Sequence, residues 1–68
     1  MDEIILSNRL KILRAERDLT QEALAQGIGV TRKSINAIEK KRMVPSVVMV
    51  LKLAEYFQVP VEEIFALK

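Results

Sequence analysis

The side chains best suited to chemistry in this 68-residue chain gather in one short segment, residues 32–42. This segment carries a formal charge of +4, whereas the stretches before and after it each sum to −1. Its charged members are Arg32, Lys33, Glu39, Lys40, Lys41 and Arg42. A local positive field of this kind is typical of a surface that binds a polyanion. The alternative interpretation is a solvated helix face without a partner.

The composition lacks the residue types that covalent and metal-dependent catalysis most often use. The chain has no Cys and no His, which excludes disulfides, thiolate or imidazole metal sites, and imidazole acid–base chemistry. Carboxylates and lysines remain, but none forms a convincing catalytic pair. We therefore expect a binding protein rather than an enzyme, with no metal and no cofactor. No second domain that could sense a small-molecule effector is evident either.

Two short helices and a tight turn must position the basic segment. Leu24 and Ile28 share one helix face, and Ile35 and Ile38 share another. Between these pairs, Gly29 tolerates the positive φ that a sharp turn requires. Each helix follows a threonine suited to cap its first turn, Thr20 and Thr31 respectively. We predict a helix-turn-helix motif over about residues 21–40, an arrangement that presents its second helix to a DNA major groove.

With its isoleucines turned inward, the second helix of this motif would present an outward face without acids. The residues on this face are Lys33, Asn36, Ala37 and Lys40, with Arg32 and Lys41 at its flanks. Folding requires this face to be polar, but it does not require the face to exclude acids. The composition therefore favours a binding role.

The remaining sequence predicts three more helices in a single all-α domain that covers residues 1–68. They span about Ser7 to Arg17, Val47 to Phe57, and a short stretch that begins near Pro60. Ser7 and Ser46 are candidate caps for the first two of these. The inward face of the helix after Ser46 would comprise Val47, Leu51 and Ala54, with Val50 and Phe57 as further candidates. We expect a five-helix bundle.

Neither a membrane span nor a secretory signal is predicted. The longest apolar run, residues 47–51, is far shorter than the roughly 20 residues that a membrane helix needs. The N-terminus is acidic, and its apolar stretch covers only residues 4–6. We therefore expect a cytoplasmic, nucleoid-associated protein with no membrane partner.

Both ends of the chain are apolar and strand-like, which is unusual for the termini of a small domain. The residues concerned are Ile4, Ile5, Ile64, Phe65 and Leu67. They could close the core of one subunit, or they could form a subunit interface as paired strands. We favour the interface, because Ile12, Val48 and Tyr56 also lack an evident role in the core. A homodimer is therefore expected.

The order of these segments resembles the Xre, or Cro/C1-type, helix-turn-helix family over about residues 8–65. The resemblance is carried by RLKILR, LTQEALA, GVTRKSI, IEK, PS, LKLA and VPVEEIF, taken in that order. Within the family, the chain is most similar to short single-domain regulators such as the cytolysin repressor. The resemblance implies a five-helix, lambda-repressor-like fold with strand-like termini that binds operator DNA as a homodimer.

The resemblance also implies DNA-binding roles for nine residues: Gln21, Thr31, Arg32, Lys33, Ser34, Asn36, Lys40, Lys41 and Arg42. Gln21 would contact a phosphate at the start of its helix, although it could also be an ordinary first-turn residue. Arg32, Lys33 and Asn36 would reach base edges or phosphates, since basic side chains suit guanine and Asn suits adenine. Thr31 and Ser34 would cap the helix and touch the DNA backbone. The cations after the helix, Lys40, Lys41 and Arg42, would contact phosphates.

The resemblance implies a different, structural role for Glu39. The matching glutamate of the family pairs with an arginine of the first helix, and Arg14 holds that place here. The competing role for Arg14 is a phosphate contact. The family often has a glycine one or two residues after this glutamate, whereas here Lys40, Lys41 and Arg42 follow. We therefore expect the helix either to continue or to end in a strained residue.

These observations predict a transcription regulator that binds double-stranded DNA sequence-specifically. Among such regulators, they favour a homodimeric repressor that occludes a promoter. Two-fold symmetry would require an inverted repeat whose half-sites lie about 34 Å apart. The first alternative is an antitoxin or other partner-binding module of the same fold, in which DNA binding is secondary. The second alternative is a helical adaptor that does not bind DNA.

Overall fold

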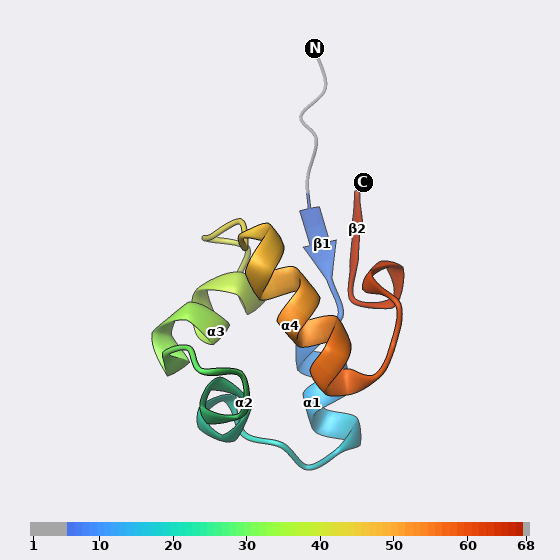
Figure 1. Ribbon diagram of the computed structural model, residues 1–68. Coiled ribbons are helices and arrows are strands. Elements are labelled where there is room, and N and C mark those ends of the chain that lie inside the picture. The colour runs from blue at the N-terminus through green and yellow to red at the C-terminus, as the bar shows by residue number, and fades with distance from the viewer. Residues whose placement is uncertain (1–5, 68) are drawn as a thin grey trace.

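The computed structural model describes residues 6–67, which form four α-helices, one 3-10 turn and a two-stranded sheet (Figure 1). In chain order these are β1 (Leu6–Asn8), α1 (Leu10–Glu16), α2 (Gln21–Ile28), α3 (Arg32–Glu39), α4 (Val47–Phe57), η1 (Val61–Glu63) and β2 (Phe65–Leu67). The prediction of a mainly helical domain is confirmed, but the predicted fifth helix is wrong. Near Pro60 the chain makes a single 3-10 turn, and the residues after it are extended.

One hydrophobic core joins all four α-helices to the C-terminal segment. Its buried members are Leu10, Leu13, Leu24, Ala25, Ile28, Ile35, Ile38, Leu53, Phe57, Ile64 and Phe65. The two apolar pairs of the predicted helix-turn-helix are among them, and Ala25 is small where α2 and α3 approach each other. Gly29 ends α2 with φ of 75°, the left-handed conformation that was predicted for the turn.

Side-chain caps set the start of three helices. Thr20, Thr31 and Ser46 each accept a hydrogen bond from the backbone N–H three residues later, at 3.0, 3.2 and 3.1 Å. These three predicted caps are confirmed. The predicted Ser7 cap is wrong, because Ser7 lies in β1; at the start of α1, the Asn8 side chain accepts from the backbone N–H of Leu10.

The sheet pairs the two ends of the described chain within one subunit. β1 and β2 are antiparallel, with Asn8 opposite Phe65, and the next backbone bond runs from the Arg9 N–H to the Ile64 carbonyl at 2.8 Å. Ile64 and Phe65 are buried in the subunit core. Their assignment to a subunit interface is therefore wrong, because folding of the single chain already covers them.

Of the other residues assigned to that interface, Leu67 is exposed at the end of β2. Ile4 and Ile5 lie outside the described residues. Among the residues of this predicted interface that the structure describes, Leu67 is therefore the one that is exposed.

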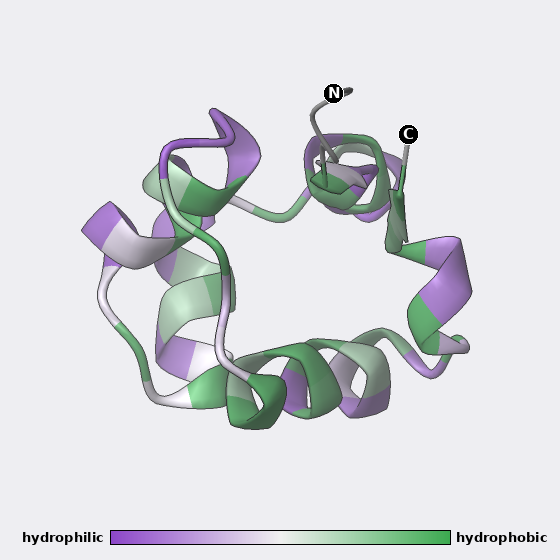
Figure 2. Cartoon of the chain, turned by 90° about the horizontal axis from the view of Figure 1, so that it is seen from above, coloured by the Kyte–Doolittle hydropathy of each residue, from purple (hydrophilic) through white to green (hydrophobic). Residues whose placement is uncertain are grey.

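The buried face of α4 differs in part from the predicted one. Phe57 is buried, and Val50 and Ala54 pack against the core, as predicted. The predictions for Val47 and Leu51 are wrong, because both are exposed and Leu53 is buried instead. The helix is apolar nearly all round, so the spacing of its residues could not identify the inward face. In Figure 2, α4 runs along the bottom of the view and is green over most of its length.

A non-glycine residue with positive φ follows three helices, within two residues of the last helical residue: Asp18 (51°), Lys41 (61°) and Gln58 (57°). After α3, the N–H of Lys41 donates to the Ile38 carbonyl and the N–H of Arg42 to the Ala37 carbonyl, at 3.0 and 2.8 Å. Such bonds close a helix when the residue past its end is left-handed, a position that favours glycine. Of the two outcomes expected after Glu39, the structure therefore shows the strained residue, which is Lys41.

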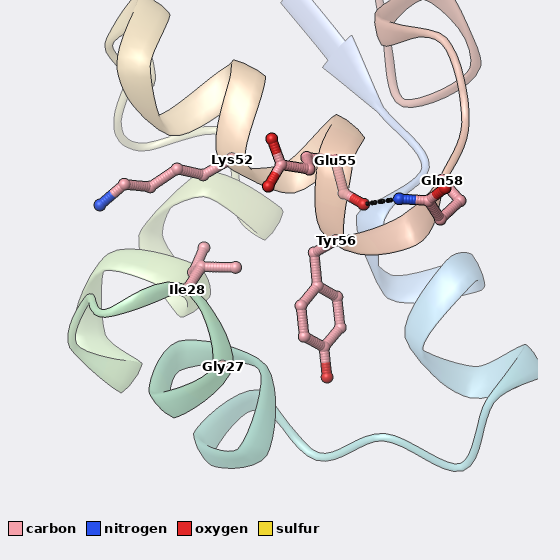
Figure 3. A pocket seen from close by; sticks show the side chains of 6 residues that line it. All are labelled: Gly27, Ile28, Lys52, Glu55, Tyr56 and Gln58. Atoms are coloured by element: carbon pink, nitrogen blue, oxygen red, sulfur yellow. Dashed lines mark hydrogen bonds between the residues drawn. The ribbon is translucent and has the colours of Figure 1, made fainter.

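Gly27 allows α2 and α4 to approach closely. A Cβ atom at this position would lie 2.6 Å from Cε1 of Tyr56, which reaches from α4 toward Gly27 (Figure 3). An open pocket of about 340 Å³ lies beside this contact, lined by Gly27, Ile28, Lys52, Glu55, Tyr56 and Gln58. Tyr56, for which the sequence indicated no core role, therefore packs against the backbone of α2.

Candidate nucleic-acid interface

The second helix of the motif, α3, stands at one edge of the molecule beside α2 (Figure 1). Ile35 and Ile38 hold it against the core. Arg32 and Lys33 are exposed at its start, and Asn36 and Ala37 are half-buried farther along. Lys40, Lys41 and Arg42 are exposed directly after its end. The predicted outward face is therefore present, with its cations at the two ends and its small and amide side chains between them.

The five cations of this region have no acidic partner within residues 6–67. The single ion pair in that part of the chain joins Arg14 to Glu39. Glu39, the one acid of the basic segment, is thus turned away from solvent and neutralised. The surface that remains is positive, which suits a polyanion.

Arg14 and Glu39 form a two-point contact between α1 and α3. Arg14 Nε donates to Glu39 Oε2 at 2.6 Å, and Nη2 donates to Oε1 at 3.0 Å. The remaining nitrogen, Nη1, donates to the Leu19 carbonyl at 2.8 Å in the loop between α1 and α2. Their side chains are only 14% and 6% exposed. The predicted pair is therefore present, and it joins three segments of the chain.

The protonation equilibria of the pair reflect this contact. Burial alone would raise the pKa of Glu39, but hydrogen bonds from Arg14 and Gln21 and the Arg14 charge outweigh it, so the pKa lies below its ordinary value. The hydrogen bond to Glu39 raises the pKa of Arg14, against an opposing effect of burial. Both groups are therefore stabilised in their charged forms.

Gln21 extends the contact from Glu39 to the outward face. Its Nε2 donates to Glu39 Oε1 at 3.0 Å and to Asn36 Oδ1 at 3.2 Å. Because an ionised carboxylate only accepts hydrogen bonds, Gln21 must turn its amide nitrogen toward Glu39. Asn36 must then turn its oxygen toward Gln21. Its nitrogen, which donates no hydrogen bond within the described residues, is left to present donors to a ligand.

The hydroxyl groups at the start of α3 bond to each other. Thr31 Oγ1 accepts from the Ser34 backbone N–H and donates to Ser34 Oγ at 3.1 Å. This places two small polar side chains beside Arg32 and Lys33 at the positive end of the helix dipole. Thr31 is exposed and Ser34 half-buried.

Two further contacts that hold the helices in place were not predicted from the sequence. The Asn8 side-chain amide donates to the Ile38 carbonyl at 2.9 Å, so β1 is bonded to the last turn of α3. Arg17 Nη2 donates to the Phe57 carbonyl at 2.7 Å, and its guanidinium lies 4.8 Å from the centre of the Phe57 ring. Both contacts join residues 30 or more positions apart, so no local pattern could reveal them.

Comparison with known proteins agrees with this arrangement. Two helices joined at a left-handed glycine, with the second turned outward and positive, define the class of helix-turn-helix proteins. The family model described as Helix-turn-helix matches residues 10–64, and the chain belongs to that family, of the Cro/C1 type. It is therefore a transcriptional regulator with a helix-turn-helix DNA-binding domain.

Two relatives illustrate this membership. The chain is 47% identical over 60 residues to an uncharacterized HTH-type transcriptional regulator of Methanocaldococcus jannaschii, with 88% of this chain and 91% of that one covered. It is 42% identical over 60 residues to the cryptic phage CTXphi transcriptional repressor RstR of Vibrio cholerae, with 88% and 54% covered.

Solved structures show the same fold. The restriction-modification controller protein C.AhdI of Aeromonas hydrophila superposes with a TM-score of 0.75 at 34% identity, over 81% of this chain and 83% of that one. The transcriptional regulator VanUg superposes with a TM-score of 0.80 over 100% and 91% of the two chains, and at 20% identity it supports the fold alone. Within residues 6–67, none of the helices is long and apolar enough to cross a membrane.

Proposed function

We propose that this regulator is a homodimeric repressor that inserts α3 into the DNA major groove and covers a promoter. The observation that carries the proposal is the acid-free positive surface made by α3 and the residues that follow it. Glu39 would repel DNA if it were exposed, but Arg14 holds it on the side of α3 that faces α1. Similarity to RstR, a phage transcriptional repressor, supports the sign of regulation.

In this proposal the exposed cations divide between bases and backbone. Arg32 and Lys33 reach guanine edges or nearby phosphates from the first turn of α3. The hydroxyl groups of Thr31 and Ser34 touch the DNA backbone beside them. Contacts to phosphates would fix the position of the domain without reading sequence. Lys40, Lys41 and Arg42 contribute those contacts beyond the helix.

Gln21 and Asn36 form the polar centre of the proposed surface. Gln21 lies in the first turn of α2, where free backbone N–H groups favour a phosphate. Asn36 was expected to suit adenine, whose recognition uses both atoms of the side-chain amide, but its oxygen already accepts from Gln21. We therefore assign Asn36 a donor role toward base or phosphate oxygens.

Selection of bound duplexes from a randomised DNA pool tests the proposed function. The expected result is an inverted repeat whose half-sites lie about one helical turn, roughly 34 Å, apart. Binding should weaken steeply as salt is raised, because each neutralised phosphate releases counterions. A pool that yields no enriched sequence, with no salt-dependent binding to any duplex, would contradict the proposal.

A further inference from the structure

Asn8 bonds the N-terminal strand to the end of the helix that carries the positive surface. Its Nδ2 donates to the Ile38 carbonyl at 2.9 Å, and its Oδ1 accepts from the Leu10 backbone N–H at 3.1 Å. The two ends of the amide thus face an acceptor and a donor, so neither an acid nor a flipped amide would satisfy both. Among residues 6–67, Asn8 alone bonds through its side chain to the backbone of residues 37–42.

The Ile38 carbonyl belongs to the turn that closes α3. It also accepts from the Lys41 backbone N–H at 3.0 Å, while the Arg42 N–H donates to the Ala37 carbonyl at 2.8 Å. This pair of bonds is the closure in which glycine usually takes the left-handed position. Here Lys41 takes that position, with φ of 61°, so the turn costs more to form than one with glycine. The bond from Asn8 fixes the carbonyl around which the strained residue folds.

Asn8 is itself held in place by the pairing of the two strands. β1 is antiparallel to β2, and Asn8 lies opposite Phe65, which is buried in the core. The next residue, Arg9, donates its N–H to the Ile64 carbonyl at 2.8 Å. The end of α3 is therefore tied to the sheet and not to a loop.

The turn that Asn8 holds carries three of the five exposed cations of the positive surface. They are Lys40, Lys41 and Arg42, which we call the basic turn. A cation on a flexible segment loses conformational freedom when it meets a phosphate, and that loss weakens binding. A turn that is fixed in the free protein avoids this loss.

We propose that Asn8 is a positioning residue for DNA binding, which holds the basic turn in the conformation that meets DNA phosphates. The inference rests on the proposed function, because the basic turn contacts phosphates only in that proposal. It adds a side chain that touches no DNA to the residues that determine affinity. Since phosphate contacts carry no sequence information, Asn8 affects affinity and its salt dependence, and it leaves base preference to residues of α3.

The substitution Asn8→Ser separates the two bonds of Asn8. A serine hydroxyl still accepts from the Leu10 N–H, as short polar side chains do at this spacing, but it is too short to reach the Ile38 carbonyl. Ser7→Ala is the matched control, because it removes the bond from Ser7 Oγ to the Ala66 carbonyl, which lies in the same strand pair and away from α3. Both variants are expected to keep the helical circular dichroism of the wild type.

Backbone hydrogen exchange of the free protein is the first measurement. In Asn8→Ser, the N–H groups of Lys41 and Arg42 should exchange about fivefold faster, the ratio that the net free energy of one hydrogen bond gives. The Val30 N–H, which closes α2, should keep its wild-type rate in the same variant. Rates at Lys41 and Arg42 no faster than those of Ser7→Ala would overturn the proposal.

The second measurement is affinity for the duplex recovered by selection, at several salt concentrations. Asn8→Ser should bind about tenfold more weakly than the wild type, because its basic turn is no longer fixed in the free protein. The slope of log affinity against log salt should decrease in magnitude by about 1, as expected when a phosphate contact is lost. Selection with Asn8→Ser should recover the same base preferences as the wild type, and Ser7→Ala should bind within about twofold of it. Wild-type affinity and slope in Asn8→Ser, or a changed base preference, would overturn the proposal.

The outcomes distinguish this inference from the proposed function. A wild type that binds no duplex would overturn the proposed function, and with it the role of Asn8 in binding, whatever the exchange rates are. A wild type that binds the selected duplex, beside an Asn8→Ser variant that binds equally well, would overturn the role of Asn8 alone.

Discussion

The Arg14 guanidinium and the Glu39 carboxylate meet through two hydrogen bonds, of 2.6 and 3.0 Å, although the residues are 25 positions apart. Through Gln21 the same carboxylate bonds to Asn36 on the outward side of α3. The pair therefore fixes the helix that carries the positive surface, and it also removes the acid that would weaken that surface.

Loss of the arginine should destabilise the fold. Arg14→Ala leaves Glu39 largely buried without its cation, and the expected cost is about 3 kcal/mol in the free energy of unfolding. Urea denaturation monitored by circular dichroism measures this cost. Lys52→Ala, which removes an exposed cation from α4, should change stability by less than about 0.5 kcal/mol. Equal losses for the two variants would show that the pair contributes little.

The lowered pKa of Glu39 predicts how stability depends on pH. A carboxyl group whose pKa is lower in the folded state stabilises the fold above its unfolded pKa, near the ordinary value of 4.5. That contribution is lost as the pH falls through the folded pKa. The wild type should therefore exceed Glu39→Gln in stability at about pH 7, and the difference should shrink toward about pH 3. A difference that is constant over this range would exclude the carboxylate as its source.

Replacement of Lys41 should relieve backbone strain. Lys41 has φ of 61°, a conformation that costs a non-glycine residue about 1 kcal/mol. Lys41→Gly should accordingly raise the melting temperature. Lys40, with φ of −86°, provides the control, because Lys40→Gly relieves no strain and should not stabilise. If both glycine variants change stability alike, the strain at Lys41 is not significant.

The contact between Gly27 and Tyr56 predicts a substitution whose effect changes sign. In a Tyr56→Ala background, Gly27→Ala should stabilise α2 by up to about 1 kcal/mol, because alanine is the better helix former. In the wild type it should destabilise, because the new Cβ would lie 2.6 Å from the Tyr56 ring. A thermodynamic cycle of the four proteins measures the coupling. Additive effects would mean that the ring moves away without cost.

The sequence was most informative where the signal is local. Thr20, Thr31 and Gly29 act through their own backbone and nearest turn, so their roles could be predicted from their positions. The Arg14–Glu39 pair is not local, and it was predicted only through the family resemblance. The missing glycine predicted that α3 would either continue or end in a strained residue, and the structure shows the second outcome, at Lys41.

The predictions that were wrong or missing concern features that local sequence does not determine. α4 is apolar on nearly every side, so spacing could not distinguish Leu53 from Leu51 as the buried leucine. Ile64 and Phe65 were recognised as apolar, but only the pairing of β1 with β2 shows that they close the core of one subunit. The contact of Asn8 with Ile38 depends on tertiary structure and left no trace in the sequence pattern.

The most direct test of the proposed role of α3 is the affinity of Lys33→Glu for the duplex recovered by selection, measured by fluorescence anisotropy. Lys33 is exposed in the first turn of α3 and contributes nothing to the core, so the variant should fold normally and bind at least about tenfold more weakly. Lys52→Glu makes the same change in net charge on α4 and should bind within about twofold of the wild type. A Lys33→Glu protein that binds as tightly as the Lys52→Glu control would contradict the assignment of α3 as the DNA-reading helix.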